Sequence, residues 1–290
     1  MALPNSGQLS ISNINYEQAN WGGLNPTGSL RQLSANAGKS TPDAISEFYG
    51  YGLATTNLQL YLTTVSLVSY PGGGAIWYDV SGNGYNATMS GTVPYVAGTP
   101  GVAGSPGYFN YSGGAYYFNG NNSLATKITS QVTISVVASI TNMSLRSFVF
   151  NKFRVSASPY GYTFEIGSDG GGAWTNSMRF YGSGYNNNST DLRGTTALNQ
   201  NQMYLFTVTY NQSTGSNIMY ANGSAISATQ AGVGSDAGWS QGNNNYQLGT
   251  LTGSEVSYMK QYAVLVWNRV LTPTEITNNY NFLKPIYGIS

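Results

Sequence analysis

The 290-residue sequence contains no cysteine and no histidine. The absence of cysteine excludes disulfide bonds, thiolate metal sites and a cysteine nucleophile. The absence of histidine removes the commonest general base, the usual zinc ligand and every Ser-His-Asp arrangement. Because Asp and Glu together number only 10, a glycosidase with paired carboxylates is the main enzyme class left. We therefore expect contact with another molecule rather than catalysis.

Charge is also scarce. Charged residues make up 7% of the chain and the formal net charge is +1, whereas soluble proteins typically carry about 25% charged residues. No cluster of Lys or Arg offers the attraction that nucleic acid or an anionic membrane requires. No apolar run approaches the roughly 20 residues of a membrane span, and Met1–Asn5 lacks the features of a signal peptide. We expect neither a nucleic-acid partner nor insertion into a membrane. We expect the protein to stay in the cytosol until assembly.

From about Leu58 onward, short apolar segments alternate with Gly- and Asn-rich turns, which is typical of an antiparallel β-sandwich. The segment Gln202–Tyr210 mixes alternation with continuous apolar residues, so it predicts a central strand covered on both faces. Asn222 and Gly223 form a hairpin-type turn signal. The predicted strands are residues 58–62, 116–118, 133–140, 147–153, 162–167, 178–181, 202–210, 216–221, 247–251 and 255–267.

Residues 1–56 differ from the rest and form an N-terminal module that is mostly irregular or helical. Apolar patterns at residues 8–14 and 29–33, with a helix signal at residues 40–50, predict helices of about two turns. Helices this short need a partner surface, so we interpret the module as an anchor that docks on another protein or on copies of itself. A small appendage folded against the sandwich is the alternative. The predicted anchor residues are Ile11, Ile14, Leu30, Leu33, Ile45, Phe48 and Tyr49.

The chain closes with a short helix signal. Thr272 and Glu275 have the spacing of a capping box, and Pro273 occupies the first helical position. The predicted helix spans residues 272–283, with Ile276, Tyr280 and Leu283 on one face. We expect this face to pack on the sandwich and to seal an open end.

Two segments carry a resemblance to a known family. Residues 69–84, followed by Tyr116–Gly120, resemble the opening of concanavalin A-like jelly rolls of the laminin G-like type, and residues 264–276 resemble that family's last strand and closing helix. The resemblance implies an all-β, antiparallel jelly-roll β-sandwich over residues 57–290. It also implies a fold that binds glycans or proteins, sometimes with a calcium ion, and that occasionally hydrolyses glycosides.

The opening segment also has a physical role of its own. Trp77 is a large anchor for the core, and the side chains of Asp79 and Asn83 can hydrogen-bond the turn between them. Gly82 and Gly84 supply positive φ angles there. Residues 1–56 in turn resemble short modules of bacteriophage virion and tail proteins, on the segments Gly7–Ile14 and Ala44–Gly50.

Carboxylates are the first candidates for chemistry. In glycosidases of this fold, two or three carboxylates alternate along one strand, but here Glu165 and Asp169 stand four apart without a middle carboxylate. We expect Glu165 to face solvent and predict no catalytic residue. A single calcium ion is the only cofactor we consider, with Asp79 and Asp169 as loop ligands; for Asp79 the structural role in the turn is the stronger interpretation.

Carbohydrate contact is the best supported kind of site. Sugars stack on aromatic rings and hydrogen-bond to amides, and three loops are rich in both groups. The alternative is that these are ordinary surface loops with inward-packed aromatic rings. The candidate ligand-binding residues are Trp174, Asn176, Tyr185, Asn187, Trp239, Asn244 and Tyr246.

Together these features predict a bacteriophage virion structural protein of the tail, a fibre or the capsid surface. It would be made in the bacterial host cytoplasm and bind other virion proteins through residues 1–56. Its sandwich would bind a host-surface glycan or stabilise the particle, as a homo-oligomer. The alternatives are a non-viral adhesion module that binds carbohydrate or protein, and more distantly a glycoside hydrolase of the concanavalin-like fold.

Overall fold

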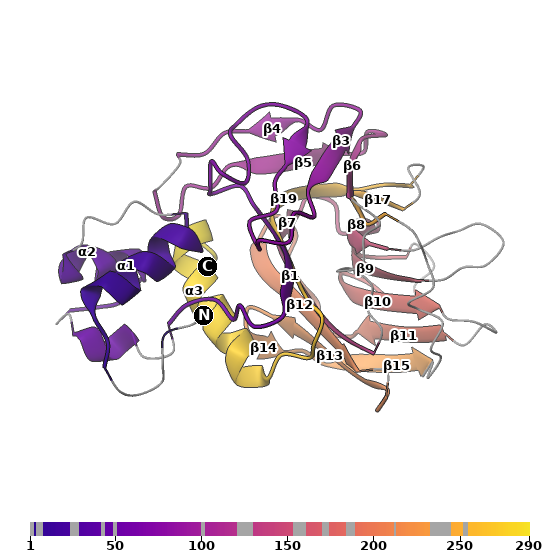
Figure 1. Cartoon of the computed structure of the whole chain (residues 1–290). Helices are drawn as coiled ribbons and strands as arrows, with labels where there is room; N and C mark the ends of the chain where they lie inside the picture. The colour runs from indigo at the N-terminus through magenta and orange to yellow at the C-terminus, as the bar shows by residue number, and fades with distance from the viewer. Residues whose placement is uncertain are drawn as a thin grey trace.

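The computed structural model describes residues 3, 8–23, 29–41, 44–48, 51–99, 102–120, 130–152, 161–169, 174–183, 189–211, 213–232, 245–251 and 255–290. Two antiparallel sheets pack face to face, and short helices lie to one side of them (Figure 1). The prediction of an all-β antiparallel sandwich with a short C-terminal helix is confirmed.

The first sheet has eight strands in the order β14-β13-β12-β7-β19-β5-β4, with β1 beside β19. The second half of β19 pairs with β1, and its first half pairs with β5. The strands are β1 (Leu58–Thr63), β4 (Tyr95–Val96), β5 (Tyr108–Ser112), β7 (Gln131–Ile140), β12 (Met203–Asn211), β13 (Ser216–Ala221), β14 (Ser224–Ala225) and β19 (Tyr258–Trp267).

The second sheet has nine strands in the order β15-β11-β10-β9-β8-β16-β6-β3-β2, and a small hairpin, β17–β18, lies beside β8. Its strands are β2 (Ile76–Trp77), β3 (Ala87–Ser90), β6 (Tyr117–Gly120), β8 (Ser147–Asn151), β9 (Gly161–Gly167), β10 (Ser177–Ser183), β11 (Ser189–Gly194), β15 (Ala228–Gly232) and β16 (Gln247–Leu248). The hairpin strands are β17 (Thr250–Leu251) and β18 (Glu255–Val256).

The main core lies between the two sheets and is built from alternate residues of each strand. Phe206 and Val208 of β12 point into it, and the Trp77 side chain is fully buried there. The indole Nε1 of Trp77 donates a hydrogen bond to the Thr63 carbonyl at 3.1 Å. The prediction that Trp77 anchors the core is confirmed.

A second apolar cluster covers the outer face of the eight-stranded sheet. Leu205 of β12, Val137 of β7 and Leu265 of β19 point into this second cluster, away from the main core. The central strands are thus apolar on both faces, as the pattern of residues 202–210 predicted.

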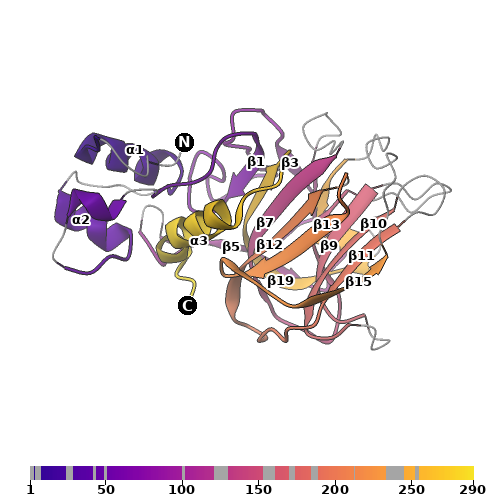
Figure 2. The same ribbon diagram turned by 90° about the horizontal axis from the view of Figure 1, so that it is seen from below.

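Helix α3 (Pro273–Tyr287) covers this outer face. Thr272 Oγ1 accepts a hydrogen bond from the Glu275 N–H at 3.2 Å, and Glu275 Oε2 accepts one from the Thr272 N–H at 2.9 Å, which forms the predicted capping box. The helix ends at Gly288, whose φ is 73°. It lies across the sheet rather than over an open end, because the apolar residues it needs are on the outer face (Figure 2).

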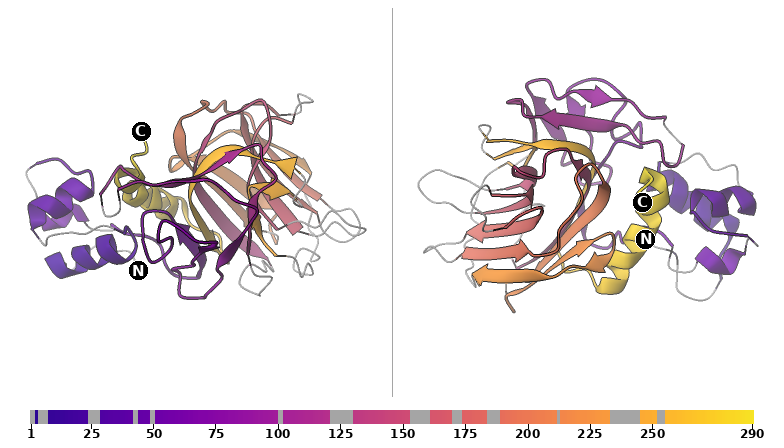
Figure 3. Two further views of the ribbon diagram at one scale, coloured as in Figure 1. Left: turned by 90° about the horizontal axis from the view of Figure 1, so that it is seen from above. Right: turned by 180° about the vertical axis from the view of Figure 1, so that it is seen from behind.

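The N-terminal module contains α1 (Ile11–Asn20), α2 (Leu30–Asn36) and a single 3-10 turn, η1 (Ile45–Phe48). Helix α3 lies between these helices and the sandwich in every view (Figure 3). The Ala54 N–H donates to Asn279 Oδ1 at 2.8 Å, and the Trp267 Nε1–H donates to the Ala54 carbonyl at 2.6 Å. The Tyr51 ring also packs edge-on against Phe282.

These contacts correct the docking interpretation of the module. Ile14, Leu33 and Phe48 are fully buried in the second cluster of this same chain, so they are not free to anchor on another protein. Ile11 and Leu30 pack against that cluster, Ile45 is 36% exposed, and Tyr49 lies outside the described residues. The short helices find their partner surface within the chain, which was the alternative interpretation. Only residues 45–48 of the predicted 40–50 helix are described as helical.

No helix in the described ranges is long and apolar enough to cross a membrane.

The capping box of α3 yields a pH-dependent prediction. Hydrogen bonds from Arg269 lower the pKa of Glu275 to about 2, so its stabilising effect is present above pH 4.5 and is lost as pH falls toward 2. We expect E275Q to lower the free energy of unfolding by about 0.5–2 kcal/mol at pH 7, with the difference shrinking in acid. Urea titrations at several pH values measure this.

The matched control is E255Q. The Glu255 carboxylate lies 3.4 Å from Arg146, and both side chains are more exposed than the Arg269–Glu275 pair, so this variant should change stability by less than about 0.5 kcal/mol. A deficit in E275Q that is the same at pH 3 and pH 7 would contradict the ionic origin of the effect.

Candidate functional site

A tight turn after β2 positions one side of the candidate site. Asp79 Oδ1 accepts hydrogen bonds from the N–H groups of Tyr61 and Ser81, both at 2.9 Å. Its Oδ2 accepts from Ser81 Oγ and from the Tyr85 N–H, also at 2.9 Å. Gly82 and Gly84 have φ values of 94° and 75°, so the predicted positive φ angles are confirmed. The Asp79 N–H in turn donates to Asn86 Oδ1 at 2.9 Å, which holds the Asn86 amide in place.

A hollow of about 460 Å³ opens beside this turn, on the outer face of the nine-stranded sheet. Thr88 of β3 lies opposite Asn119 of β6 in the sheet register. Their neighbours Ala87 and Phe118 point into the main core, so Thr88 and Asn119 point outward. We call this site the sheet hollow; it is lined by Gly84, Asn86, Thr88, Asn119, Gly120 and Asn245.

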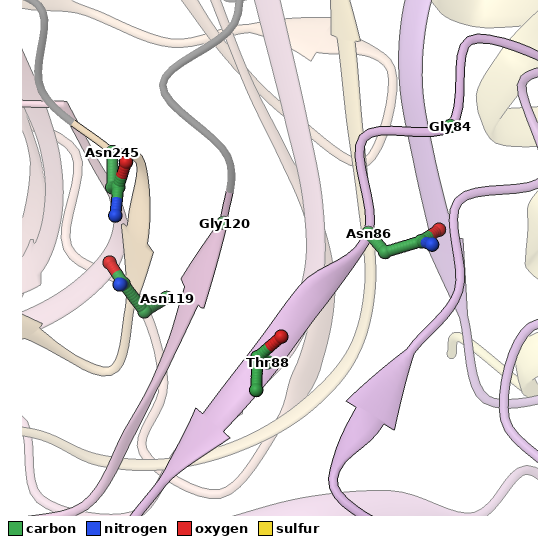
Figure 4. Close-up of a pocket in the computed structure, with 6 residues that line it drawn as sticks. All are labelled: Gly84, Asn86, Thr88, Asn119, Gly120 and Asn245. Atoms are coloured by element: carbon green, nitrogen blue, oxygen red, sulfur yellow. The ribbon is translucent and has the colours of Figure 1, made fainter.

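The described residues that line the sheet hollow are glycines and uncharged polar residues. Asn119 Oδ1 is buried and accepts no hydrogen bond from any described residue. Figure 4 shows the amide groups of Asn119, on β6, and Asn245, just before β16, turned toward one another. Each amide can both donate and accept hydrogen bonds, so the site suits a neutral ligand rich in hydroxyl groups. Its volume falls in the range of about 300–1,000 Å³ that is usual for ligand sites.

Tyr246 supports the sheet hollow from beneath. Its side chain is fully buried, and its hydroxyl donates to the Tyr85 carbonyl at 2.6 Å. Its ring stacks on Phe150 and presses against Gly120, where a Cβ atom would lie 1.9 Å from the ring. Burial raises the pKa of Tyr246 well above its usual range. The prediction that Tyr246 contacts a ligand is therefore wrong, because no face of the ring is exposed.

The other predicted contact residues do not line the sheet hollow. Trp174 is 4% exposed, so its ring packs inward and offers no stacking surface. Asn176 is exposed in a left-handed conformation with φ of 48°, and its N–H donates to Ser168 Oγ. Tyr185, Asn187, Trp239 and Asn244 lie outside the described residues. Asn245, directly after Asn244, does line the hollow.

Glu165 belongs to a network of charges on the outer face of β9, β10 and β11. Arg179 lies opposite Glu165, with 3.5 Å between Nη1 and Oε2, and donates two hydrogen bonds to Asp191 at 2.9 and 3.1 Å. Arg193 Nη2 also donates to Asp191, at 2.7 Å. Glu165 is 1% exposed, so the expectation that it faces solvent is wrong. Two cations match two anions, which makes the network a clamp across three strands.

The pKa shifts in this clamp follow from burial and pairing. Burial raises the pKa of Glu165 despite the nearby charge of Arg179. Burial acts in the same direction on Asp191, but hydrogen bonds from Arg179 and Arg193 outweigh it and lower the pKa of Asp191. The two carboxylates thus shift in opposite directions because Asp191 receives most of the guanidinium hydrogen bonds.

The geometry at Asp79 does not fit a calcium ion. Four N–H and O–H donors already occupy both carboxylate oxygens, so the structural interpretation of Asp79 holds. In the described ranges, no three side chains of the Asp, Glu, His and Cys types cluster as a metal site would require. The backbone of Asp169 donates to the Trp174 carbonyl, and residues 170–173 between them are not described.

Sequence reasoning missed most of the sheet hollow. Thr88 and Asn119 occur in the short strands β3 and β6, and Asn86 directly precedes β3, which was not predicted at all. The glycine at residue 120 makes room for the Tyr246 ring beneath the hollow, so the Asn-Gly pair at residues 119–120 did not by itself indicate a ligand site.

No family model matches the sequence, and no curated protein matches it. Solved structures do. The chain is similar to the binding domain of Paraclostridial Mosquitocidal Protein 1, with a TM-score of 0.58 and 14% identity over 78% of this chain and 52% of that one. It is also similar to Trypanosoma rangeli sialidase, with a TM-score of 0.55 and 15% identity over 81% of this chain and 34% of that one.

A third similar structure is the binding domain of botulinum neurotoxin DC. In complex with SialylT it has a TM-score of 0.54 and 14% identity, over 79% of this chain and 52% of that one. The same domain has been solved with rat synaptotagmin II. The chain thus spans about half or less of the chains it matches, and at these identities the likeness shows the β-sandwich fold alone.

The saturation of Asp79 predicts how its removal acts. We expect D79A to lower the free energy of unfolding by about 1–3 kcal/mol, because the Tyr61, Ser81 and Tyr85 donors lose their acceptor. Denaturant titrations in excess calcium and in EDTA should give the same loss. If calcium stabilised the wild type but not D79A, the carboxylate would be an ion ligand instead.

Proposed function

We propose that the chain is a non-catalytic, lectin-like module that binds a neutral glycan in the sheet hollow. The observation that carries this proposal is the buried Oδ1 of Asn119, which receives no hydrogen bond from the described residues and lies in a hollow whose described lining is rich in amides and uncharged. A buried acceptor without a partner costs about 1–3 kcal/mol. A sugar hydroxyl supplies the missing donor, and the amide of Asn245 faces Asn119 across the hollow.

The similar structures support a binding role. The binding domain of botulinum neurotoxin DC forms complexes with SialylT and with synaptotagmin, and the T. rangeli sialidase has been solved with sialic acid. The described lining of the sheet hollow has no Lys or Arg to pair with a sialic acid carboxylate. We therefore propose an uncharged sugar as the ligand of this chain.

The first experiment is a glycan array with asparagine variants. N119A and N245A should each weaken binding to a neutral glycan by roughly tenfold, because each removes a hydrogen-bonding amide from the hollow. N20A is the control, since the Asn20 side chain bonds its own helix at the Tyr16 carbonyl. A preference for sialylated glycans, or equal binding by N119A and wild type, would contradict the proposal.

For the setting, we propose the surface of a bacteriophage particle, in the tail, a fibre or the capsid. The segments of residues 1–56 that resemble virion modules and the low charge of the chain support this. Contact with other virion proteins would use the exposed side of the module, where Tyr16 is 55% exposed, rather than its buried apolar residues. Copies placed by symmetry would strengthen a weak glycan contact through multivalency.

Particle location tests this setting. Antibodies against the sandwich should label purified phage particles, and a Y16A variant should be incorporated less efficiently if the exposed side of α1 is the docking face. I218A is the control, because Ile218 is similarly exposed but lies on β13 of the sandwich. Absence of the chain from purified particles would leave a non-viral adhesion module as the better interpretation.

A further inference from the structure

A second hollow, of about 500 Å³, lies where the N-terminal module meets the C-terminal end of α3. Lys39, Tyr51, Lys284, Pro285 and Ile289 are among its lining residues. It shares no residue with the sheet hollow. We call it the seam hollow, because its walls come from segments far apart in the sequence.

Two helix ends create the seam hollow. Helix α2 is followed by Gly38, whose φ is 66°, and α3 is followed by Gly288, whose φ is 73°. Glycines in the left-handed conformation end helices and have no side chain. At both helix ends, therefore, no side chain of these glycines fills the hollow. A Cβ atom at Gly38 would lie 3.5 Å from Pro285 Cβ, which shows how closely the two helix ends approach.

Both lysines are held at the seam hollow by aromatic rings. Lys39 Nζ lies 5.4 Å from the centroid of Phe48 and 6.0 Å from that of Tyr51, and Lys284 Nζ lies 5.7 Å from that of Tyr280. Within the described ranges, neither ammonium group forms an ion pair with a carboxylate. The ring contacts restrict the lysines and leave their N–H donors available.

The described lining of the seam hollow carries two lysines and no Asp or Glu. The partial negative charges at the C-terminal ends of α2 and α3 offset part of the charge of Lys39 and Lys284. The carboxyl of Glu17 acts on Tyr51 but is buried inside the module rather than in this lining.

Apart from Asn281, the other side chains that line the hollow are mostly apolar. Ala37, Tyr51 and Ile289 are each less than a tenth exposed and face the hollow. A small hydrophilic anion would leave the apolar side chains of the hollow exposed to water. A neutral apolar ligand would give the lysine ammonium groups no hydrogen-bond acceptor. We propose that the seam hollow binds an organic carboxylate with a short apolar body, with Lys39 and Lys284 on the carboxylate.

Three six-carbon probes with different head groups test the charge requirement. Hexanoate should bind in isothermal titration calorimetry, whereas hexanol and hexylamine should bind at least tenfold more weakly, because only the carboxylate pairs with the lysines. Raising the salt concentration should weaken hexanoate binding. Equal affinity for hexanoate and hexanol would overturn the proposal.

Lysine variants locate the site. K39M and K284M should each weaken hexanoate binding by roughly tenfold, since each removes one charged donor. K260M is the matched control, because Lys260 also lies over an aromatic ring, that of Tyr108, but outside the seam hollow. Thermal unfolding of each variant checks that it is folded. If K39M disturbs the N-terminal module, K284M still tests the site. Unchanged affinity for hexanoate in a folded variant that carries both K39M and K284M would overturn the assignment.

The same chemistry could come from a free acid or from the acidic end of a peptide. N-acetylleucine, with N-acetylleucinamide as its neutral partner, separates the two. Tighter binding of N-acetylleucine than of hexanoate assigns the site to a peptide end, whose amide can bond the exposed Asn281. The reverse order assigns it to a free acid. This inference is independent of glycan binding, so N119A should bind hexanoate as the wild type does.

Discussion

The structure depends on central strands that are apolar on both faces. Val264 and Val266 of β19 contact the other sheet, while Leu265 and Trp267 contact α3 and the N-terminal module. A β-sandwich needs only one covered face per sheet, so this sheet demands an additional layer. Helix α3 supplies part of that layer and the module supplies the rest. The module is therefore a component of the fold, whatever else its exposed side contacts.

Local signals in the sequence were predictive where a few neighbouring residues determine the structure. The capping box of Thr272 and Glu275 needs only a spacing of three residues, and three of the four hydrogen bonds to Asp79 come from Ser81 and Tyr85 in the same turn. Both were predicted in place. Trp77 was predicted as a core anchor because a large aromatic side chain gains much from burial.

Signals that depend on strand pairing were not predictive. Asn119 faces a ligand-sized hollow because β6 pairs with β3 on one side and β16 on the other, and residues 88 and 247 meet at its level. The residues next to Asn119 in the sequence do not indicate that β3 and β16 pair with β6 at this position. Glu165 is buried because its partners Arg179 and Asp191 arrive on two other strands. The short strands, such as β2 and β4, lack an alternating pattern long enough to detect.

Scarcity of charge explains why the two hollows differ in chemistry. The clamp of Glu165, Arg179, Asp191 and Arg193 uses four of the 21 charged residues to join three strands. Surfaces elsewhere rely more on amides and hydroxyls, and the described side chains that line the sheet hollow are of these types. Against this neutral background, two lysines in one hollow are a concentration of charge that the fold does not require. The proposed neutral contact surface on the sandwich and the proposed charged site at the seam would therefore select different ligands without competing.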